Sequence, residues 1–163
     1  MSAGLWSVSV TAAALGSGVV GGVLYGFSAF VMRGLDETRP GSAVAAMQEI
    51  NRAAPRAPLT VPLLGTALLC VLLAVHAVRD LLRDGDSTPS WWVLAGCALY
   101  LVAFVITAAY HVPRNDALMA VDAAGADAAA AWRDYAGPWV RMNHVRAAAA
   151  IASSASFMVA LLH

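Results

Sequence analysis

The sequence predicts an all-α integral membrane protein: a four-helix bundle with short amphipathic helices in two long connections on one side. Hydrophobic residues make up 60% of the 163 residues before glycine is counted, whereas soluble globular proteins reach about 45–50% with glycine included. Charged residues account for only 12%, with ten basic residues against ten acidic ones. This composition excludes a soluble enzyme, a disordered chain and a nucleic-acid binder, which needs a basic surface.

The few charges are distributed unevenly and mark the candidate spans. No charged residue occurs in residues 1–32, 57–78, 87–113 or 147–163. Each run holds nearly the 20 or so apolar residues that a helix needs to cross about 30 Å of hydrocarbon. We therefore predict a single domain, residues 1–163, with transmembrane helices over about 5–32, 57–78, 90–110 and 145–162. The first is longer than a bilayer requires, so we expect it to tilt or protrude.

The connections between these spans predict the orientation. Residues 79–89 form a short connection, whereas 33–56 and 111–146 are long and, because successive connections alternate sides, share one face. The long connections contain eight of the ten arginines. The positive-inside rule then places the long connections in the cytoplasm. We expect a multi-pass protein of the plasma (cytoplasmic) membrane.

Both long connections have the pattern of short helices. In the first, after Pro40, the apolar residues recur at helical spacing: Ala43, Met47, Ile50 and Ala54. Its polar residues are predicted to face away: Gln48, Glu49 and Arg52. We expect this helix to lie on the membrane or to cap the bundle.

The second long connection carries an aromatic stripe. Asn115 follows Pro113 as a candidate helix start, and Gly125 is expected to interrupt that helix. Beyond it, one helical stripe leads into the fourth span: Trp132, Tyr135, Trp139 and Asn143.

Small residues in the first span indicate close helix packing. Gly18, Gly22 and Gly26 follow one another at steps of four residues, which is typical of helix contacts in lipid. The contact could lie within the chain or form a homo-oligomer, and a groove kept open for a ligand is the alternative.

The remaining polar groups gather at the side of the long connections. They border the third and fourth spans or approach from the first connection: His111, Asn115, Asn143, His144, Arg146, Asn51 and Arg56. Such groups at membrane depth are costly unless paired or functional. Together they offer a histidine base, amide donors and acceptors, and a fixed cation.

Structural explanations for the same residues stay open. Asn115 could cap its own helix, and Arg146 could reach lipid headgroups or pair with Asp134 or Asp116. The tryptophans could belong to an interfacial belt. Because no metal-binding motif accompanies the histidines, no cofactor is predicted; a metal ion, if present, would use His111 and His144.

Several short motifs along the chain together resemble those of a known family. The order of several short motifs is similar to that of the anthrone oxygenase family, small four-span membrane proteins: Tyr25–Met32, Ala46–Asn51, Thr107 with Val112–Leu118, Trp132, Tyr135, Trp139 and Asn143–Arg146. The resemblance implies a membrane-embedded oxidoreductase that oxidises a hydrophobic anthrone-like aromatic substrate with O2. It maps the family's polar positions to Asn51, Asn115, Trp132, Trp139, Asn143, His144 and Arg146, while His111 replaces a frequent asparagine.

The residue types fit that chemistry. His144 or His111 could remove a proton from the substrate, and the resulting anion could be stabilised by amides and a cation: Asn143, Asn115, Asn51 and Arg146. Trp132, Trp139 and Tyr135 could hold the aromatic plane. The alternative is a non-enzymatic membrane scaffold or partner-binding subunit, in which Asn51, Asn143 and Arg146 bond one another in a closed arrangement. A transporter ranks below both, because no inverted repeat is evident.

Overall fold

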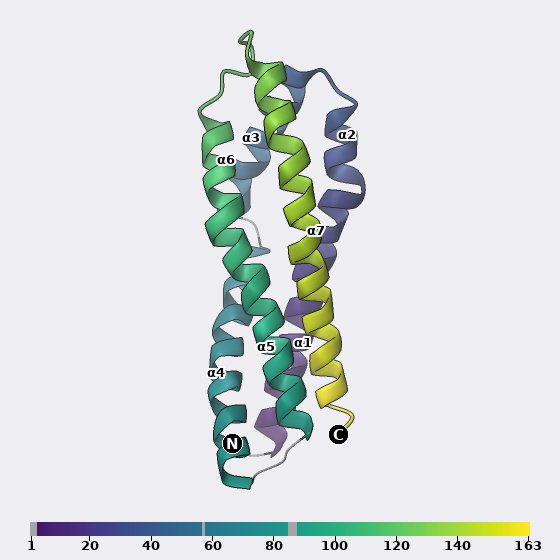
Figure 1. The fold of residues 1–163 in the computed structure, drawn as a ribbon, viewed down its shortest axis with the longest axis vertical. Coiled ribbons are helices and arrows are strands. Elements are labelled where there is room, and N and C mark those ends of the chain that lie inside the picture. Colours follow the sequence, from purple (N-terminus) through teal and green to yellow (C-terminus); the bar gives the residue numbers. More distant parts are fainter. Residues whose placement is uncertain (1–2, 57, 85–87) are drawn as a thin grey trace.

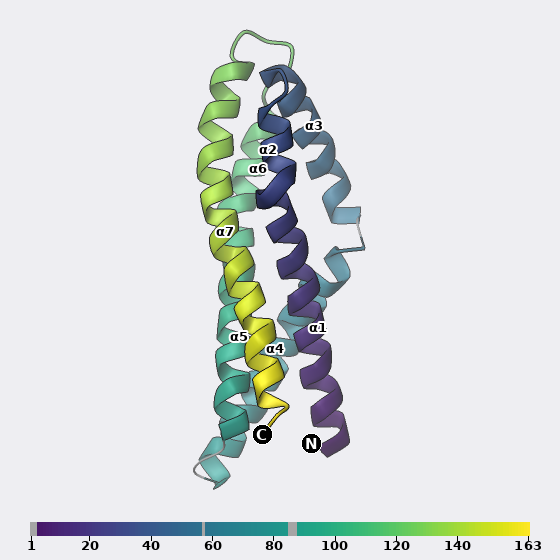
Figure 2. The same ribbon diagram turned by 90° about the vertical axis from the view of Figure 1, so that its right-hand side faces the viewer.

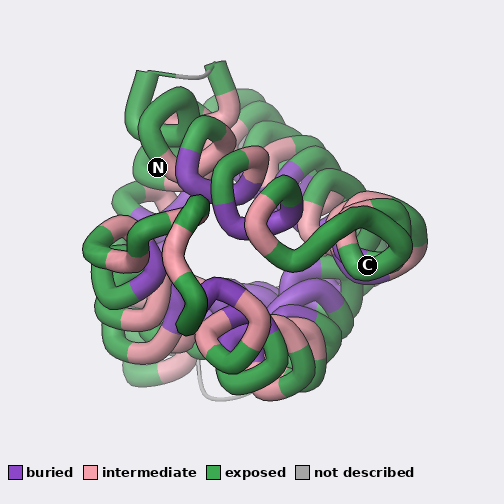
Figure 3. The backbone as a smooth tube through the Cα atoms, turned by 90° about the horizontal axis from the view of Figure 1, so that it is seen from above, coloured by how far each residue is buried: buried purple, intermediate pink, exposed green. Residues whose placement is uncertain are grey.

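The computed structural model describes residues 3–56, 58–84 and 88–163, and these form an all-α bundle. Its helices run along one long axis, with both termini at the same end (Figure 1). The two long connections turn at the opposite end, as the alternation of sides predicts. Seen along the axis, the buried residues face the interior of the bundle (Figure 3).

Two of the long helices contain a π-helical segment. In the first, α1 (Ala3–Gly26) continues through η1 (Phe27–Val31) into α2 (Met32–Asp36). In the second, α5 (Thr88–Ile106) continues through η3 (Thr107–His111) into α6 (Val112–Met119). A π segment inside an α-helix is rare and frequently marks a functional site.

An amphipathic helix and two further long helices complete the bundle. The amphipathic helix α3 (Pro40–Ala53) leads through a 3₁₀ turn, Ala54–Arg56, to α4 (Thr60–Asp84). The last helix, α7 (Ala128–Ala160), is unbroken although it contains Pro138. It packs against α1 and α5 in its C-terminal part and against α3, α6 and α2 in its N-terminal part (Figure 2).

Two hydrophobic clusters fill the bundle. One lies among α1, α4, α5 and α7 and includes Val10, Cys70, Tyr100 and Phe157. The other lies among α2, α3, α6 and α7 and includes Met47 and Trp139. The polar groups considered below lie mostly on α7 and on the two π segments, between these clusters and beside the second.

Three helices in the described part of the chain are long and apolar enough to cross a membrane: Gly4–Asp36, Thr60–Arg83 and Thr88–Met119. They correspond to the first three predicted spans, and the third extends nine residues beyond the predicted end at Tyr110. The predicted span 145–162 coincides with the end of α7, which is not among these three helices. Small and polar residues such as Ala150, Ser153 and Ser156 form the buried face of this segment.

Three sequence expectations are corrected. Gln48 does not face away but is buried, where its amide donates to the carbonyls of Leu118 at 2.9 Å and Val121 at 2.8 Å. Ala54 is exposed because α3 has ended there. Asn115 does not start a helix, because the chain passes through η3 into α6 without a break.

Other local expectations agree with the structure. The chain turns around Gly125 between α6 and α7, and the aromatic stripe lies on α7. The short connection is tighter than 79–89, since α4 ends at Asp84 and α5 begins at Thr88; Gly85 within it lies outside the described residues.

The glycine stripe serves contacts of different kinds. A Cβ on Gly18 would meet the Ser154 hydroxyl at 3.2 Å, so this position faces α7 within the chain. A Cβ on Gly22 would meet nothing within 4 Å, and one on Gly26 would meet only the ring of Phe30. Close packing inside the chain therefore accounts for Gly18 but not for Gly22.

Candidate functional site

The two π segments lie beside the same part of α7. Ser28 in η1 and Thr107 in η3 are both hydrogen-bonded to neighbouring side chains on that helix, Asn143 and Arg146. Because these two side chains lie three residues apart, they share one face of α7. A hydrogen-bonded link therefore crosses the bundle from η1 through α7 to η3.

Asn143 is the centre of this link and is fully buried. Its amide nitrogen donates to the Leu24 carbonyl at 2.7 Å and to the Ser28 hydroxyl, while its oxygen accepts from Nε of Arg146 at 2.8 Å. A carbonyl can only accept and a guanidinium can only donate, so these partners determine the orientation of the amide.

Arg146 is buried without an acidic partner among the residues that the structure describes. Its Nη1 donates to the Thr107 hydroxyl at 3.2 Å, and its guanidinium carbon lies 5.3 Å from the centre of the Trp139 ring. The expected pairing with Asp134 or Asp116 does not occur. Buried charges are normally paired, so the amide, hydroxyl and ring here replace a counter-ion.

Asn115 gathers two members of the aromatic stripe. Its oxygen accepts from the Tyr135 hydroxyl at 2.8 Å and from Nε1 of Trp139 at 3.0 Å. Burial raises the pKa of Tyr135, an effect that the nearby Asn51 side chain opposes. Nδ2 of Asn51 is itself buried and has no hydrogen-bond partner among the described residues. Asn51 therefore borders Tyr135 but is not bonded to Asn143 or Arg146.

The aromatic stripe forms core rather than an open surface. Trp132, Tyr135 and Trp139 are between 2% and 5% exposed. Nε1 of Trp132 donates to the Asp36 carboxylate at 3.0 Å, which ties α7 to α2. The stripe thus holds the second cluster together, and only Tyr135 borders a small pocket of about 200 Å³ between α6 and α7.

The two candidate histidines do not converge. His111 is buried, with its two ring nitrogens each 3.3 Å from a backbone carbonyl, those of Ile106 and Trp139. His144 is exposed, and its Nδ1 lies 2.9 Å from the carbonyl of Val140. Along the described residues no group of three metal-ligating side chains gathers. The placement of the two rings gives no support to a metal ion held by both.

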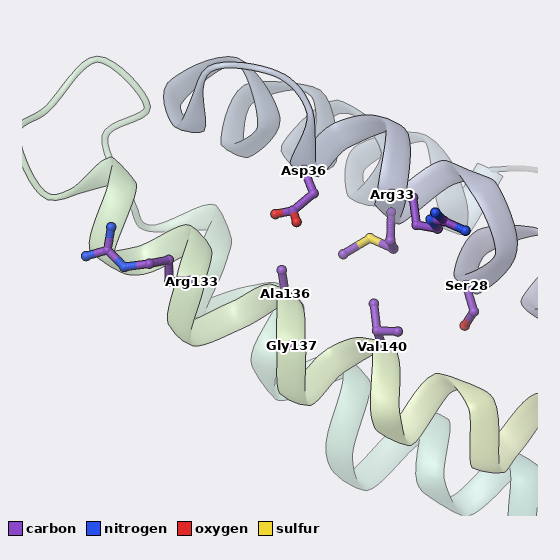
Figure 4. A pocket seen from close by; sticks show the side chains of 8 residues that line it. Ser28, Arg33, Asp36, Arg133, Ala136, Gly137 and Val140 are labelled. Atoms are coloured by element: carbon purple, nitrogen blue, oxygen red, sulfur yellow. The ribbon is translucent and has the colours of Figure 1, made fainter.

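A pocket of about 400 Å³ lies between α2 with η1 on one side and α7 on the other (Figure 4). Its walls combine apolar and charged side chains: Ser28, Met32, Arg33, Asp36, Arg133, Ala136, Gly137 and Val140. The Asp36 carboxylate, Ala136 and Val140 point into the space, whereas the Arg133 side chain is directed away from it (Figure 4). The volume is within the range of small-molecule sites, about 300–1,000 Å³.

The pocket connects with the predicted site through two residues. Ser28 lines it and is bonded to Asn143. His144 follows Val140 by one helical turn, on the same face of α7 as Arg133 and Gly137. His144 thus lies one turn beyond Val140, the last lining residue of α7, and does not itself line the pocket. None of the site residues predicted from the sequence is among the lining residues of this pocket.

None of the lining residues of this pocket was predicted as a site residue from the sequence. Arg33 and Asp36 belong to a helix that the sequence assigns to a loop beyond the first span, and Ser28 is one hydroxyl in an apolar run. A signal was nevertheless present on α7, where Arg133, Gly137 and His144 recur at multiples of about one turn. This stripe is as regular as the aromatic one and lies on a different face.

The fold and the site define a small α-helical protein with helices long and apolar enough to span a membrane, and with an accessible pocket near its long connections. Residues 55–156 match the family model described as Anthrone oxygenase, and the chain belongs to this family. No curated protein and no solved structure matches the chain. The match begins after α3, so the pocket residues of α2 and η1 lie outside it.

Proposed function

We propose that this protein is a membrane-embedded oxidoreductase that oxidises a hydrophobic, anthrone-like aromatic compound with O2. The observation that carries the proposal is the α2–α7 pocket, whose apolar wall lies on the face of α7 that carries His144 one turn beyond the lining residue Val140. Family membership supports the reaction class. The scaffold alternative predicts that Asn51, Asn143 and Arg146 bond one another; Asn143 and Arg146 do so and are buried, whereas Nδ2 of Asn51 has no partner among the described residues.

His144 is the better placed of the two candidate bases. When Nδ1 donates to the Val140 carbonyl, Nε2 carries the lone pair that a base needs. In His111 both ring nitrogens face backbone carbonyls, so neither has a lone pair directed at a substrate. His111 instead joins η3 to α7.

The reaction needs few parts from the protein. His144 takes one proton from the methylene carbon, and the carbanion forms a bond to dioxygen. Loss of the second methylene hydrogen as a proton cleaves the O–O bond and leaves a new carbonyl, and the proton held by His144 is returned to the departing oxygen, which leaves as water. Met32, Ala136 and Val140 supply an apolar wall for the rings.

The environment suits this substrate class. We propose that residues 145–162, the C-terminal half of α7 and the two residues that follow it, complete a four-span domain in the plasma membrane, with the arginine-rich connections in the cytoplasm. The pocket then lies near the cytoplasmic interface, where both an apolar substrate and lipid-dissolved O2 are available. The buried face of the proposed span is covered by α1 and α5.

The test is oxidation of anthrone by the purified protein in detergent, measured as quinone absorbance against the spontaneous rate. We expect acceleration by the wild type and its loss in His144→Gln. The control is His163→Gln at the chain end, which changes the same residue type outside the pocket. Equal rates with and without wild-type protein would reject the enzyme and favour the scaffold.

A further inference from the structure

The hydroxyl of Ser28 is unusual among the buried hydroxyls of this bundle. Ser17, Thr107 and Ser156 each donate to the carbonyl four residues earlier, at 2.7, 2.9 and 3.0 Å. For Ser28 that carbonyl belongs to Leu24, and it accepts from Asn143 instead. Ser28 also accepts from Asn143, so its oxygen is used as an acceptor.

Among the residues that the structure describes, no hydrogen bond donated by the Ser28 hydroxyl is found, so its proton is available to a further acceptor. Ser28 is 4% exposed and lines the α2–α7 pocket. A buried donor without a partner is costly. The nearest place where an acceptor can be supplied is the pocket itself, so the geometry calls for a ligand oxygen at this point.

The chain of hydrogen bonds behind Ser28 has a single direction. Arg146 donates to Asn143, and Asn143 donates to Ser28. Each donation polarises the next group and makes it a stronger donor, because consecutive hydrogen bonds reinforce one another at low dielectric. The buried guanidinium of Arg146 thereby polarises the neutral Ser28 hydroxyl at the pocket wall and makes it a stronger hydrogen-bond donor.

We propose that Ser28 donates a hydrogen bond to the carbonyl oxygen of an aromatic ketone in this pocket, with Asn143 and Arg146 as positioning residues behind it. The inference rests on the proposed function and extends it by naming the group that stabilises the oxygen of the anion. When a proton leaves the methylene carbon, negative charge moves to the ketone oxygen, and a preorganised donor there lowers the barrier.

The binding test compares two rigid aromatic probes that differ by one carbonyl oxygen, 9-fluorenone and fluorene. Dissociation constants are measured in detergent for wild type, Ser28→Ala and Ser28→Thr. Partition into detergent cancels when the ratio of the two constants is compared between proteins. We expect the preference for fluorenone to fall about five- to tenfold in Ser28→Ala, as for loss of one hydrogen bond, and to be retained in Ser28→Thr.

Two further variants separate the hydroxyl from the fold. Ser154→Ala removes another interhelical hydroxyl, which donates to the Ala14 carbonyl at 2.8 Å, and should leave the ratio unchanged. Asn143→Asp keeps the shape of the side chain but replaces the donor to Ser28 with an acceptor, which would attract the Ser28 proton. We expect Asn143→Asp to lose the preference although Ser28 is still present; retention would overturn the role of Asn143 as a positioning residue.

Turnover gives a second readout. Ser28→Ala should reduce kcat for anthrone oxidation by about 10²-fold, as for removal of one oxyanion donor, with a smaller change in KM. If wild type and Ser28→Ala bind both probes with the same ratio, the role of Ser28 is overturned while the pocket stands. If the wild type binds neither probe, the pocket and the proposed function fail together.

Discussion

The link between Asn143 and Arg146 gives a quantitative prediction about stability. Replacing Asn143 with leucine keeps much of the volume but removes the bonds to Leu24, Ser28 and Arg146. Interhelical hydrogen bonds in membrane proteins average about 0.6 kcal/mol, and bonds to a charged group contribute about 1.5–3 kcal/mol. We therefore expect Asn143→Leu to lower the free energy of unfolding by about 3 kcal/mol.

A double-mutant cycle tests the physical reason. In Asn143→Leu the buried guanidinium of Arg146 loses its amide acceptor, so adding Arg146→Met removes a poorly satisfied charge. The double variant should be more stable than the sum of the single changes predicts, with a coupling of about 1.5–3 kcal/mol. The assay is unfolding in mixed micelles, followed by tryptophan fluorescence. Single effects that add within about 0.5 kcal/mol would refute the direct interaction.

Two further predictions concern packing and pH. Gly21→Ala should destabilise the bundle by about 1–3 kcal/mol in thermal or denaturant unfolding, because its Cβ would lie 2.8 Å from Cγ1 of Ile151. Gly22→Ala, whose Cβ meets nothing within 4 Å, should not; equal effects would contradict the packing. Burial raises the pKa of Tyr135 in the folded state, so above about pH 10 the unfolded chain loses the phenol proton while the folded state keeps it. The free energy of unfolding therefore falls as the pH rises above about 10. Tyr135→Phe should therefore flatten the alkaline fall in unfolding free energy by up to about 1.4 kcal/mol per pH unit; an unchanged slope would contradict the shift.

The bundle was predictable because its strongest determinant is local. Charge-free runs and helical spacing depend only on neighbouring residues, so they predict the long helices and the aromatic stripe without tertiary information. The family resemblance seen in short motifs is confirmed by the match over residues 55–156.

The wrong predictions concern residues whose positions are determined by contacts with distant parts of the chain. Gln48 was expected at the surface, but its partners, Leu118 and Val121, lie about 70 residues away. Pro113 resembled a helix start because proline lacks the N–H that an interior position donates. In the structure Pro113 lies in the first turn of α6, directly after the π segment η3, and the helix continues to Met119.

The candidate site was predicted as a list of residue types but not as a shape. Asn143, Arg146 and Asn115 are brought into hydrogen-bonded groups, whereas His144 is exposed on α7 and His111 is buried in η3. A sequence shows that a polar group needs a partner; it does not show which one is chosen. The pocket depends on where α2 lies relative to α7, which no local pattern encodes.

The central claim is that chemistry occurs in the α2–α7 pocket, and blocking the pocket tests it directly. A Cβ on Gly137 would meet only Nη1 of Arg141, at 3.9 Å, so Gly137→Phe can be introduced without a backbone clash and would fill the pocket. Gly34→Phe is the matched control, since Gly34 on α2 has nothing within 4 Å of its Cβ and does not line the pocket.

The measurement is quinone formation together with O2 uptake from anthrone by the three purified proteins. The account predicts one O2 consumed per quinone, acceleration by the wild type and Gly34→Phe, and the spontaneous rate for a folded Gly137→Phe. Full activity in Gly137→Phe would contradict the pocket as the site of reaction.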